Sequence, residues 1–509
     1  MQQRLVTEDS HPSSKPCVVC GKGKLLAVGI FLILLGVLAA SLLGVYRSKE
    51  DTKILRGRFG IIFDAGGSGT RMAVYEYTDN KMKELEYIKC EDNGLAKFVG
   101  RENEIAAPLN RCLEKAEKQV PLQVEGSTPI YMSGTAGMRL LNESSSKNIW
   151  KTVRGVLNNG SFLVKMVGTL PGKKEAAYSW TTINSLLQTK QNTSGLLELG
   201  STSLQLSFES HTPAAIPSAH KDEVKFNGKK YNIYAHSYLC FGATEFIKKY
   251  RAFVIKEANF SSTIEDPCLF QGYNVTVQSS IWKEACVRML VDDKAMAAHG
   301  TTSYTLVGTS NYTQCLNTIK KMHNESLCTK DECKENDFLQ EHAAGLFTAI
   351  GGGVYFSSSF LNIPQPTTLT SYMNATMTLC SYTFQRLKKM KSFTDFAVNY
   401  CLNDVYNYYI MNDILKLGGK GTVQFKRKIN GERLVWTVGS MLNHVDEMSP
   451  VLVERSRKIS SLVFNLFIVV SVLFIVIGFV LIVRSRDYFR REWSINNSNN
   501  NVNPQSINL

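Results

Sequence analysis

Two stretches of this 509-residue chain contain residue types suited to binding phosphate. In the first, an apolar run ends at Asp64 and is followed by a turn made of Gly66, Gly67, Ser68, Gly69 and Thr70. Glycines let successive backbone N–H groups approach an anion without Cβ interference, and the hydroxyls donate further hydrogen bonds. Asp64 is placed to reach a divalent cation through water. An ordinary turn between two strands has the same composition, so this stretch alone leaves both interpretations open.

A later stretch repeats the pattern. Glu198 ends an apolar run and is followed by Gly200, Ser201, Thr202, Ser203 and Gln205. Pairing Asp64 with Glu198 indicates two related lobes, each with one loop facing a shared cleft. Two unrelated glycine turns could match as loosely, so the repeat needs support from other segments.

Two segments between these stretches supply further candidates. Residues 130–141 predict a short strand, a small-residue loop with Thr135 and Ala136, and a helix whose start and Arg139 suit an anion. The same small residues would also permit close packing. Glu175 lies at the head of a predicted helix over 172–184, where a glutamate can also serve only to offset the helix dipole.

Both ends of the chain contain an apolar run. Residues 25–45 and 459–483 are uncharged and long enough to cross a membrane. Basic residues before the first run and after the second predict cytoplasmic tails at 1–24 and 484–509, with an outward domain over 46–458. A cleaved signal peptide is the alternative for the first run, although its apolar part is longer than usual. No small-residue pattern indicates an interface between the runs, and the Asn- and Ser-rich tail is typical of disorder.

The cysteines and glycosylation signals agree with an outward domain. Ten of the twelve cysteines lie between the two apolar runs, an even number suited to disulfides in an oxidising compartment. The formal net charge of +14 favours an anionic ligand, although a basic solvated surface is the commoner meaning of such an excess. Eight N-x-[S/T] sequons also lie in this region, at Asn142, Asn159, Asn192, Asn259, Asn274, Asn311, Asn324 and Asn374.

Taken in order, five segments resemble the five apyrase-conserved regions of the ecto-nucleoside triphosphate diphosphohydrolases. The segment 236–242 is similar to another recurrent stretch of that family, and the terminal runs resemble those of its cell-surface, two-span members. The resemblance implies an α/β, two-lobed actin- and hexokinase-like fold with duplicated RNase H-like cores. It also implies hydrolysis of extracellular nucleoside tri- and diphosphates with Ca²⁺ or Mg²⁺ and without a phosphoenzyme. The five segments are residues 60–75, 130–141, 172–184, 196–208 and 436–443.

The resemblance assigns a role to each candidate residue. Glu175 would orient and deprotonate the attacking water, which Ser203 and Gln205 would hold against the terminal phosphate. Asp64 and Glu198 would gather the water shell of the cation rather than bind the cation directly. Tyr355 or Phe356 would stack on the nucleobase, unless it is an ordinary core aromatic. The phosphates would be surrounded by Gly66, Gly67, Ser68, Gly69, Thr70, Thr135, Ala136, Gly200, Ser201, Thr202 and Ser203.

The family's disulfide pattern implies five pairs, although spacing alone does not determine the connectivity. The pairs are Cys90 with Cys112, Cys240 with Cys286, Cys268 with Cys315, Cys328 with Cys333, and Cys380 with Cys401.

Several positions depart from the family pattern. The first loop usually reads Asp-Ala-Gly-Ser-Ser-His-Thr, so Gly67 and Gly69 replace a serine and a histidine and remove two phosphate donors. The usual Asp-Leu-Gly-Gly-Ala-Ser of the fourth region becomes Glu198-Leu-Gly-Ser-Thr-Ser, with a longer carboxylate and a Cβ at residue 201. Near the predicted base, the family's glycines become Ala176 and Ser179. These departures could weaken catalysis or shift substrate preference.

We therefore predict a plasma-membrane ecto-apyrase that hydrolyses ATP, ADP, UTP or UDP outside the cell. The alternative is a catalytically weakened paralogue that binds nucleotides as a surface receptor or adhesion protein. A sugar or acetate kinase on the same fold fits poorly, because an exoplasmic domain meets little ATP to spend on phosphorylation. Nucleic acid is not an expected partner. The ATP-to-ADP preference, the base specificity and the oligomeric state stay open, with a homo-oligomer as one option.

Overall fold

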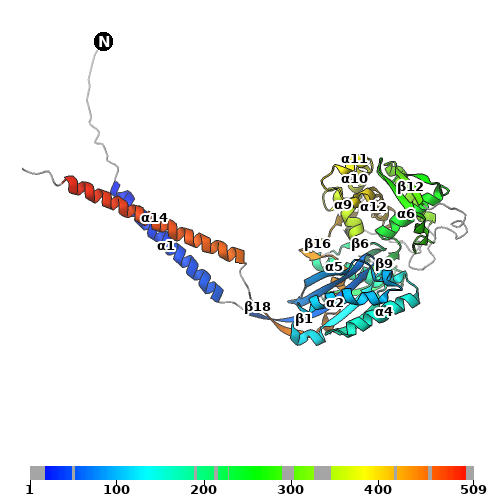
Figure 1. The fold of residues 1–509 in the computed structure, drawn as a ribbon, viewed down its shortest axis with the longest axis horizontal. Coiled ribbons are helices and arrows are strands. Elements are labelled where there is room, and N and C mark those ends of the chain that lie inside the picture. The colour runs from blue at the N-terminus through cyan, green and yellow to red at the C-terminus, as the bar shows by residue number, and fades with distance from the viewer. Residues whose placement is uncertain are drawn as a thin grey trace, which may run out of the picture. The chain divides into compact units, whose positions relative to one another are not determined.

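The computed structural model describes residues 18–48, 52–187, 192–210, 216–226, 228–288, 303–325, 345–417, 421–456 and 461–499. The chain divides into two compact units. One consists of Met1–Leu55 with Leu452–Leu509, and the other is Arg56–Val451. The second unit contains two lobes, each built on its own sheet (Figure 1).

The first lobe is built on a six-stranded sheet of order β3-β2-β1-β4-β5, with β18 (Pro450–Ser456) pairing with β1 off this path. β1, β2 and β3 are antiparallel neighbours, whereas β4 and β5 run parallel to β1. The amphipathic helices α2 and α4 belong to this lobe, and Asn142 caps α4 by accepting from the Ser145 N–H. The elements are β1 (Thr52–Gly66), β2 (Gly69–Thr78), β3 (Lys81–Glu91), α2 (Ala106–Glu117), β4 (Pro129–Gly134), α3 (Ala136–Arg139), α4 (Glu143–Asn158) and β5 (Leu163–Thr169).

The second lobe repeats this arrangement in a seven-stranded sheet of order β14-β15-β13-β6-β7-β9-β8. Its segment β9-β7-β6-β13-β15 has the same order and the same strand directions as β3-β2-β1-β4-β5. β1 therefore corresponds to β6, and β2 to β7, which confirms the predicted duplicated core. The strands are β6 (Gly195–Leu199), β7 (Ser203–Glu209), β8 (Lys221–Phe226), β9 (Lys229–Leu239), β13 (Gly345–Ile350), β14 (Thr367–Thr368) and β15 (Gly421–Phe425).

Helices and a small sheet complete the second lobe. A three-stranded sheet of order β10-β12-β11 and most of the helices share one large apolar core. These elements are α6 (Ala243–Glu257), β10 (Thr263–Asp266), β11 (Asn274–Gln278), β12 (Ser303–Gly308), α8 (Tyr312–Glu325), α9 (Gly352–Phe360), α10 (Leu369–Cys380), α11 (Phe384–Lys388) and α12 (Tyr400–Tyr409).

Two helices cross between the lobes. α5 (Gly172–Leu187) follows the first sheet but buries Trp180 and Ile183 against the second. α13 (Trp436–Asn443) follows the second sheet but packs Trp436 and Met441 against the first. The helices touch at Gly439, where a Cβ would lie 2.0 Å from the Tyr178 carbonyl oxygen. The contact between α5 and α13 therefore places the start of α5 beside both sheets.

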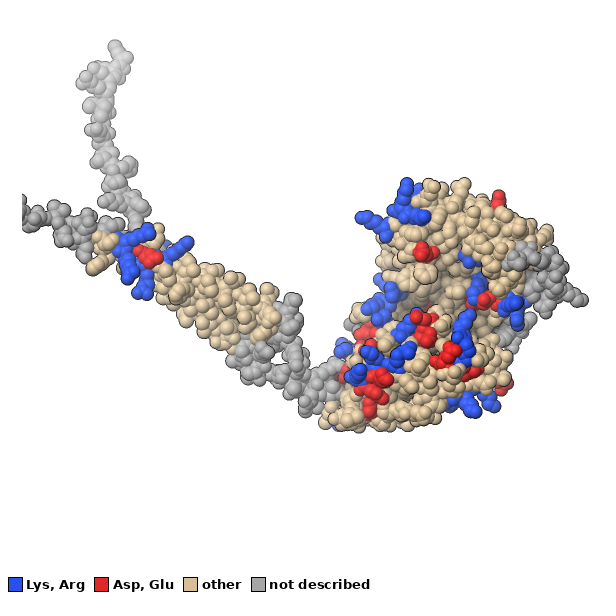
Figure 2. All heavy atoms as spheres, in the orientation of Figure 1, with Lys and Arg blue, Asp and Glu red and all other residues tan. Residues whose placement is uncertain are grey.

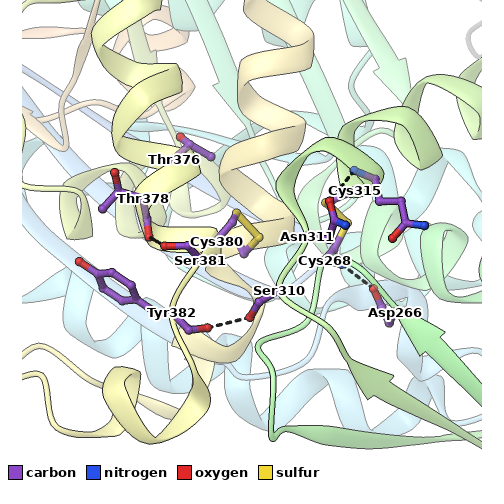
Figure 3. Close-up of a disulfide and its surroundings, with 12 residues drawn as sticks. Asp266, Cys268, Ser310, Asn311, Cys315, Thr376, Thr378, Cys380, Ser381 and Tyr382 are labelled. Atoms are coloured by element: carbon purple, nitrogen blue, oxygen red, sulfur yellow. Dashed lines mark hydrogen bonds between the residues drawn. A yellow bond between two sulfur atoms is a disulfide. The ribbon is translucent and has the colours of Figure 1, made fainter.

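Four of the five implied disulfides are present: Cys90–Cys112, Cys240–Cys286, Cys268–Cys315 and Cys380–Cys401. Cys328 and Cys333 lie outside the described residues. Figure 3 shows Cys268–Cys315 and Cys380 near Ser310, whose hydroxyl donates to the Tyr382 carbonyl oxygen at 2.7 Å. The disulfides and this contact link the small sheet to α8, α10 and α12.

The other unit is a pair of long apolar helices, α1 (Val18–Ser48) and α14 (Ser461–Asn499). The stretches Gly23–Leu42 and Phe464–Arg491 are long and apolar enough to cross a membrane. The helices pack through small residues spaced by seven. A Cβ at Gly29 would lie 2.8 Å from the Gly478 carbonyl oxygen, and one at Gly36 would lie 2.8 Å from that of Ser471.

This helix contact was not predicted, because a spacing of seven differs from the small-xxx-small pattern. α14 also continues to Asn499, so the first residues of the Asn- and Ser-rich tail are helical and the prediction of disorder is wrong for them. Figure 2 shows the pair as an almost uncharged surface with basic residues gathered near one end. The sequence there contains Lys24, Arg484, Arg486, Arg490 and Arg491.

Candidate active site

Asp64 and Glu198 occupy equivalent positions in the two lobes. Each lies near the carboxyl end of the strand that begins its repeat, Asp64 on β1 and Glu198 on β6. Asp64 pairs in register with Arg71 on β2, and Glu198 pairs with Gln205 on β7. The repeat seen in the sequence is therefore a repeat of position in the fold.

These two carboxylates share their surroundings with Glu175. Burial raises the pKa of Asp64 to about 7, opposed by Arg71 and by a hydrogen bond from Trp436, while the charge of Glu175 raises it further. Burial also raises the pKa of Glu198 to about 8, with further upward contributions from Glu175 and Asp64. Glu175 therefore lies close enough to both carboxyls to raise their pKa values, and such a cluster of acidic side chains attracts a cation.

The chemistry of this cluster fits a hard divalent cation. Its donors are carboxylate oxygens, and the enclosed Asp64 Oδ1 has no hydrogen-bond partner among the described residues. Within those residues, no group of three or more Asp, Glu, His or Cys side chains is close enough to hold an ion directly. A cation held through water by Asp64 and Glu198 stays a prediction made from the resemblance.

Glu175 lies in the first turn of α5 and is ion-paired. Arg139 Nη1 donates to Glu175 Oε2 at 2.7 Å, and the two side chains are only 6% and 8% exposed. The helix can begin this close to β9 because residue 172 is glycine: a Cβ there would lie 2.6 Å from the Ser237 Cβ. Arg139 also donates to Ser203 and Ser237, so it connects the predicted base to hydroxyls of the second lobe.

Ser203 and Gln205 form one hydrogen-bonded cluster with Ser237. Gln205 Nε2 donates to Ser203 Oγ and, at 3.1 Å, to Ser237 Oγ. Arg139 Nη2 donates to Ser237 Oγ at 2.9 Å and to Ser203 Oγ at 3.4 Å. Sequence reasoning missed Ser237, although it lies in the noted segment 236–242, and gave Arg139 only a general anion role.

The loop at Gly67 is enclosed by other loops of the first lobe. The Thr135 N–H donates to the Ala65 carbonyl oxygen at 3.1 Å, which ties the start of α3 to the end of β1. A Cβ at Gly137 would lie 3.3 Å from the Gly67 Cα, and one at Gly94 would lie 2.5 Å from the Gly66 carbonyl oxygen. Thr135 and Ala136 are buried beside this loop, and their predicted role in lining a phosphate cleft stays a prediction.

The loop over 200–203 rests on the start of α6. N–H groups of Cys240, Ala243 and Thr244 donate to the carbonyl oxygens of Thr202, Gly200 and Ser201 at 2.9, 2.9 and 3.0 Å. Gly242 is required there, since a Cβ would lie 2.3 Å from the Thr202 nitrogen. The three carbonyl oxygens are hydrogen-bonded on the α6 side of the loop. The hydroxyls of Ser201 and Thr202 lie on its opposite side, next to Gly67.

The aromatic candidates lie on α9, which begins against β6. Gly351 has a φ of 92°, and a Cβ there would lie 2.4 Å from the Leu199 carbonyl oxygen. Phe356 is 48% exposed, whereas Tyr355 is partly buried. The Arg427 guanidinium lies 5.1 Å from the Phe356 ring centre and 5.7 Å from that of Tyr355. Tyr355 packs against the large apolar core of the second lobe while Phe356 is more exposed, so both the stacking role and the core role predicted for Tyr355 stay open.

Comparison with known proteins decides the relationship. Residues 51–461 match the GDA1/CD39 (nucleoside phosphatase) family. The chain belongs to this family. It is 25% identical over 427 residues to ectonucleoside triphosphate diphosphohydrolase 3 of Mus musculus, covering 78% of this chain and 80% of the relative.

A second relative covers nearly the whole chain. Ectonucleoside triphosphate diphosphohydrolase 1 of Rattus norvegicus is 26% identical over 511 residues, covering 93% of this chain and 97% of its own. Among solved structures, a nucleoside triphosphate hydrolase from Neospora caninum has a TM-score of 0.61 at 13% identity, covering 81% of this chain and 96% of that one. This last similarity supports the two-lobed fold.

Two positions that the sequence analysis noted as departures from the family pattern contact each other. Ser179, where the family usually has glycine, donates from its hydroxyl to Glu198 Oε2 at 2.5 Å. Glu198 itself replaces the usual aspartate. The longer carboxylate thus reaches α5, and a new hydroxyl binds it there.

Proposed function

We propose that this GDA1/CD39 family member hydrolyses extracellular nucleoside tri- and diphosphates by attack of an activated water on the terminal phosphorus. The observation that supports this best is the convergence of Asp64, Glu175 and Glu198 with Ser203 and Gln205. Phosphoryl transfer to water needs positioning, charge neutralisation and a proton acceptor. Ser203 and Gln205 would supply the positioning and Glu175 the proton acceptor, while a divalent cation held by Asp64 and Glu198 would supply the charge neutralisation.

In this proposal Glu175 is the general base. Its Oε2 is bound by Arg139, so Oε1 is the oxygen that accepts the water proton. Ser203 and Gln205 hold the same water in line with the bond that breaks. The water oxygen forms the new P–O bond, the P–O bond to the leaving phosphate breaks, and the leaving group departs as the shorter nucleotide.

Asp64 and Glu198, one from each lobe, would hold Ca²⁺ or Mg²⁺ through its water shell. When bound, the ion neutralises negative charge on the phosphate oxygens. The turn at 66–70 and the loop at 200–203 surround those oxygens, with Thr135 and Ala136 beside them. Tyr355, with Phe356 next to it, stacks on the nucleobase.

The proposed location is the plasma membrane, with the domain 46–458 outside the cell and both tails inside. All seven sequon asparagines with described side chains are exposed, as glycosylation requires. Four disulfides fit an oxidising compartment. The basic residues after the second apolar run favour a cytoplasmic tail there. The spans 25–45 and 459–483 act as retained anchors.

The decisive experiment compares intact cells that express the wild-type chain or Glu175→Gln. Cells receive ATP or ADP with Mg²⁺ or Ca²⁺, and released phosphate is followed, with surface protein matched by biotinylation. Glu175→Gln is expected to lower the rate by about two to four orders of magnitude. Phosphate release by the wild-type chain that is as low as that of cells without the protein would instead favour the weakened, nucleotide-binding paralogue.

A further inference from the structure

A buried arginine connects the proposed base to the groups proposed to hold the water. Arg139 is the last residue of the short helix α3, in the first lobe. Its guanidinium reaches Glu175 on α5 and Ser203 and Ser237 on β7 and β9 of the second lobe. In the described contacts, Arg139 is the side chain of the site that bonds Glu175, Ser203 and Ser237 together.

The terminal nitrogens of Arg139 already have acceptors inside the protein. Nη1 donates to Glu175 Oε2 and, at 3.2 Å, to the Leu170 carbonyl oxygen. Nη2 donates to Ser237 Oγ and Ser203 Oγ. Each terminal nitrogen of the guanidinium therefore makes two hydrogen bonds to protein oxygens, which equals the number of its N–H bonds. This geometry argues against phosphate binding by these nitrogens, the role that a cationic residue in a phosphate cleft first suggests.

We propose that Arg139 is a positioning residue for the hydrolysis. It binds Glu175 through Oε2, which turns Oε1 toward the water, and it aligns Ser203 directly and Gln205 through Ser237. The planar fork of arginine suits this task, because its donors diverge in fixed directions toward the carboxylate and the hydroxyls. Its charge also offsets the cost of burying the Glu175 carboxylate. This inference rests on the proposed role of Glu175.

The role predicts a specific kinetic signature in the purified full-length protein. Arg139→Ala should lower kcat by about 100-fold and leave KM for ATP nearly unchanged, since misplacing reacting groups by about 1 Å has such an effect. Arg139→Lys should recover part of kcat, because the lysine ammonium restores the positive charge but not the planar set of guanidinium donors. Ser237→Ala should lower kcat less than Arg139→Ala, again with KM preserved.

Chemical rescue separates positioning from a purely structural role. Guanidinium ion at a millimolar, non-denaturing concentration should restore a large part of kcat to Arg139→Ala, and sodium at equal ionic strength should not. Arg154→Ala is the matched control: this exposed arginine of α4 in the same lobe bonds only the Val167 carbonyl oxygen in the described contacts. Its kcat should match the wild type and should not respond to guanidinium.

Three results would overturn the proposal. A rise in KM alone for Arg139→Ala would make Arg139 a phosphate-binding residue. Loss of activity together with a lowered melting temperature and no rescue would make its role structural. A kcat of Arg139→Ala equal to that of the wild type would show that Arg139 has no role in the hydrolysis. Activity retained by Glu175→Gln would refute the proposed base itself, so the two failures are distinguishable.

Discussion

Gly67 and Thr202 face each other across the two loops of the site so closely that a Cβ at residue 67 would lie 2.3 Å from the Thr202 hydroxyl oxygen. The Ser201 hydroxyl would lie 2.9 Å from the same Cβ. Thr202 and Ser201 stand where the family usually has small residues, and Gly67 stands where it has serine. The hydroxyls of the second lobe therefore fill the space of the side chain that the first loop lacks.

This relationship predicts a compensating pair of substitutions. Gly67→Ser should lower kcat/KM by at least tenfold, because the new side chain displaces the loop at 200–203. Adding Thr202→Ala should restore part of the loss, since it removes the clashing hydroxyl. Residues in contact commonly couple by about 0.5–3 kcal/mol, so the steady-state kinetics of both single variants and the double variant will measure the coupling. Additive effects would show that the two positions are independent.

Ser179 and Glu198 form the second pair of departures. The Ser179 hydroxyl lowers the pKa of Glu198, against the upward effects of burial and of Glu175. Ser179→Ala should raise that pKa, leave more Glu198 protonated at neutral pH and raise the Mg²⁺ concentration for half-maximal activity several-fold. Mg²⁺ titrations of activity at pH 7 and pH 9 will check this. The difference between the two chains should shrink as the pH rises from 7 to 9, because Glu198 becomes more ionised in both; a difference that does not shrink would contradict the explanation.

Asp64 and Glu198 also predict how stability depends on pH in the absence of divalent cations. Their pKa values are raised in the folded chain, to about 7 and about 8. Their protonation therefore stabilises the fold fully below pH 4, and this contribution is lost as pH rises through about 8. Thermal unfolding in EDTA should show the loss.

Added Mg²⁺ or Ca²⁺ should then raise the melting temperature more at pH 8 than at pH 6, because protons compete with the ion at pH 6. Asp64→Asn, which removes one of the two charges, is the control and should reduce the difference. An equal rise at both pH values would place the ion elsewhere.

Tyr355 provides a test of nucleobase binding. Tyr355→Ala should raise KM for ATP by about tenfold, in the range of one lost base–aromatic contact, and leave KM for inorganic tripolyphosphate unchanged. Phe356→Ala tells whether the more exposed neighbour shares the contact. Equal changes for ATP and tripolyphosphate would mean that the helix α9, rather than a ring, was disturbed.

Much of the site could be predicted from the sequence because it lies in short local patterns. The apolar runs that end in Asp64 and Glu198, each followed by a glycine turn, predict two strands and their turns from neighbouring residues alone. The helix start at Glu175, the terminal spans and the even cysteine count are likewise local or additive signals. The resemblance then supplied the roles and the disulfide pairs, of which four are present.

Only the tertiary structure decided which residues meet. Arg139 lies 36 positions from Glu175 and 98 from Ser237, so no local pattern could reveal that one guanidinium binds both. The pairing of Gly67 with Thr202, and of Ser179 with Glu198, likewise depends on how the two sheets approach and on the crossing of α5 and α13. Read along the chain, each departure looks like a lost donor or a misplaced side chain. In three dimensions, packing density and hydrogen bonding couple those positions, because a hydroxyl can occupy only space that a neighbour leaves free.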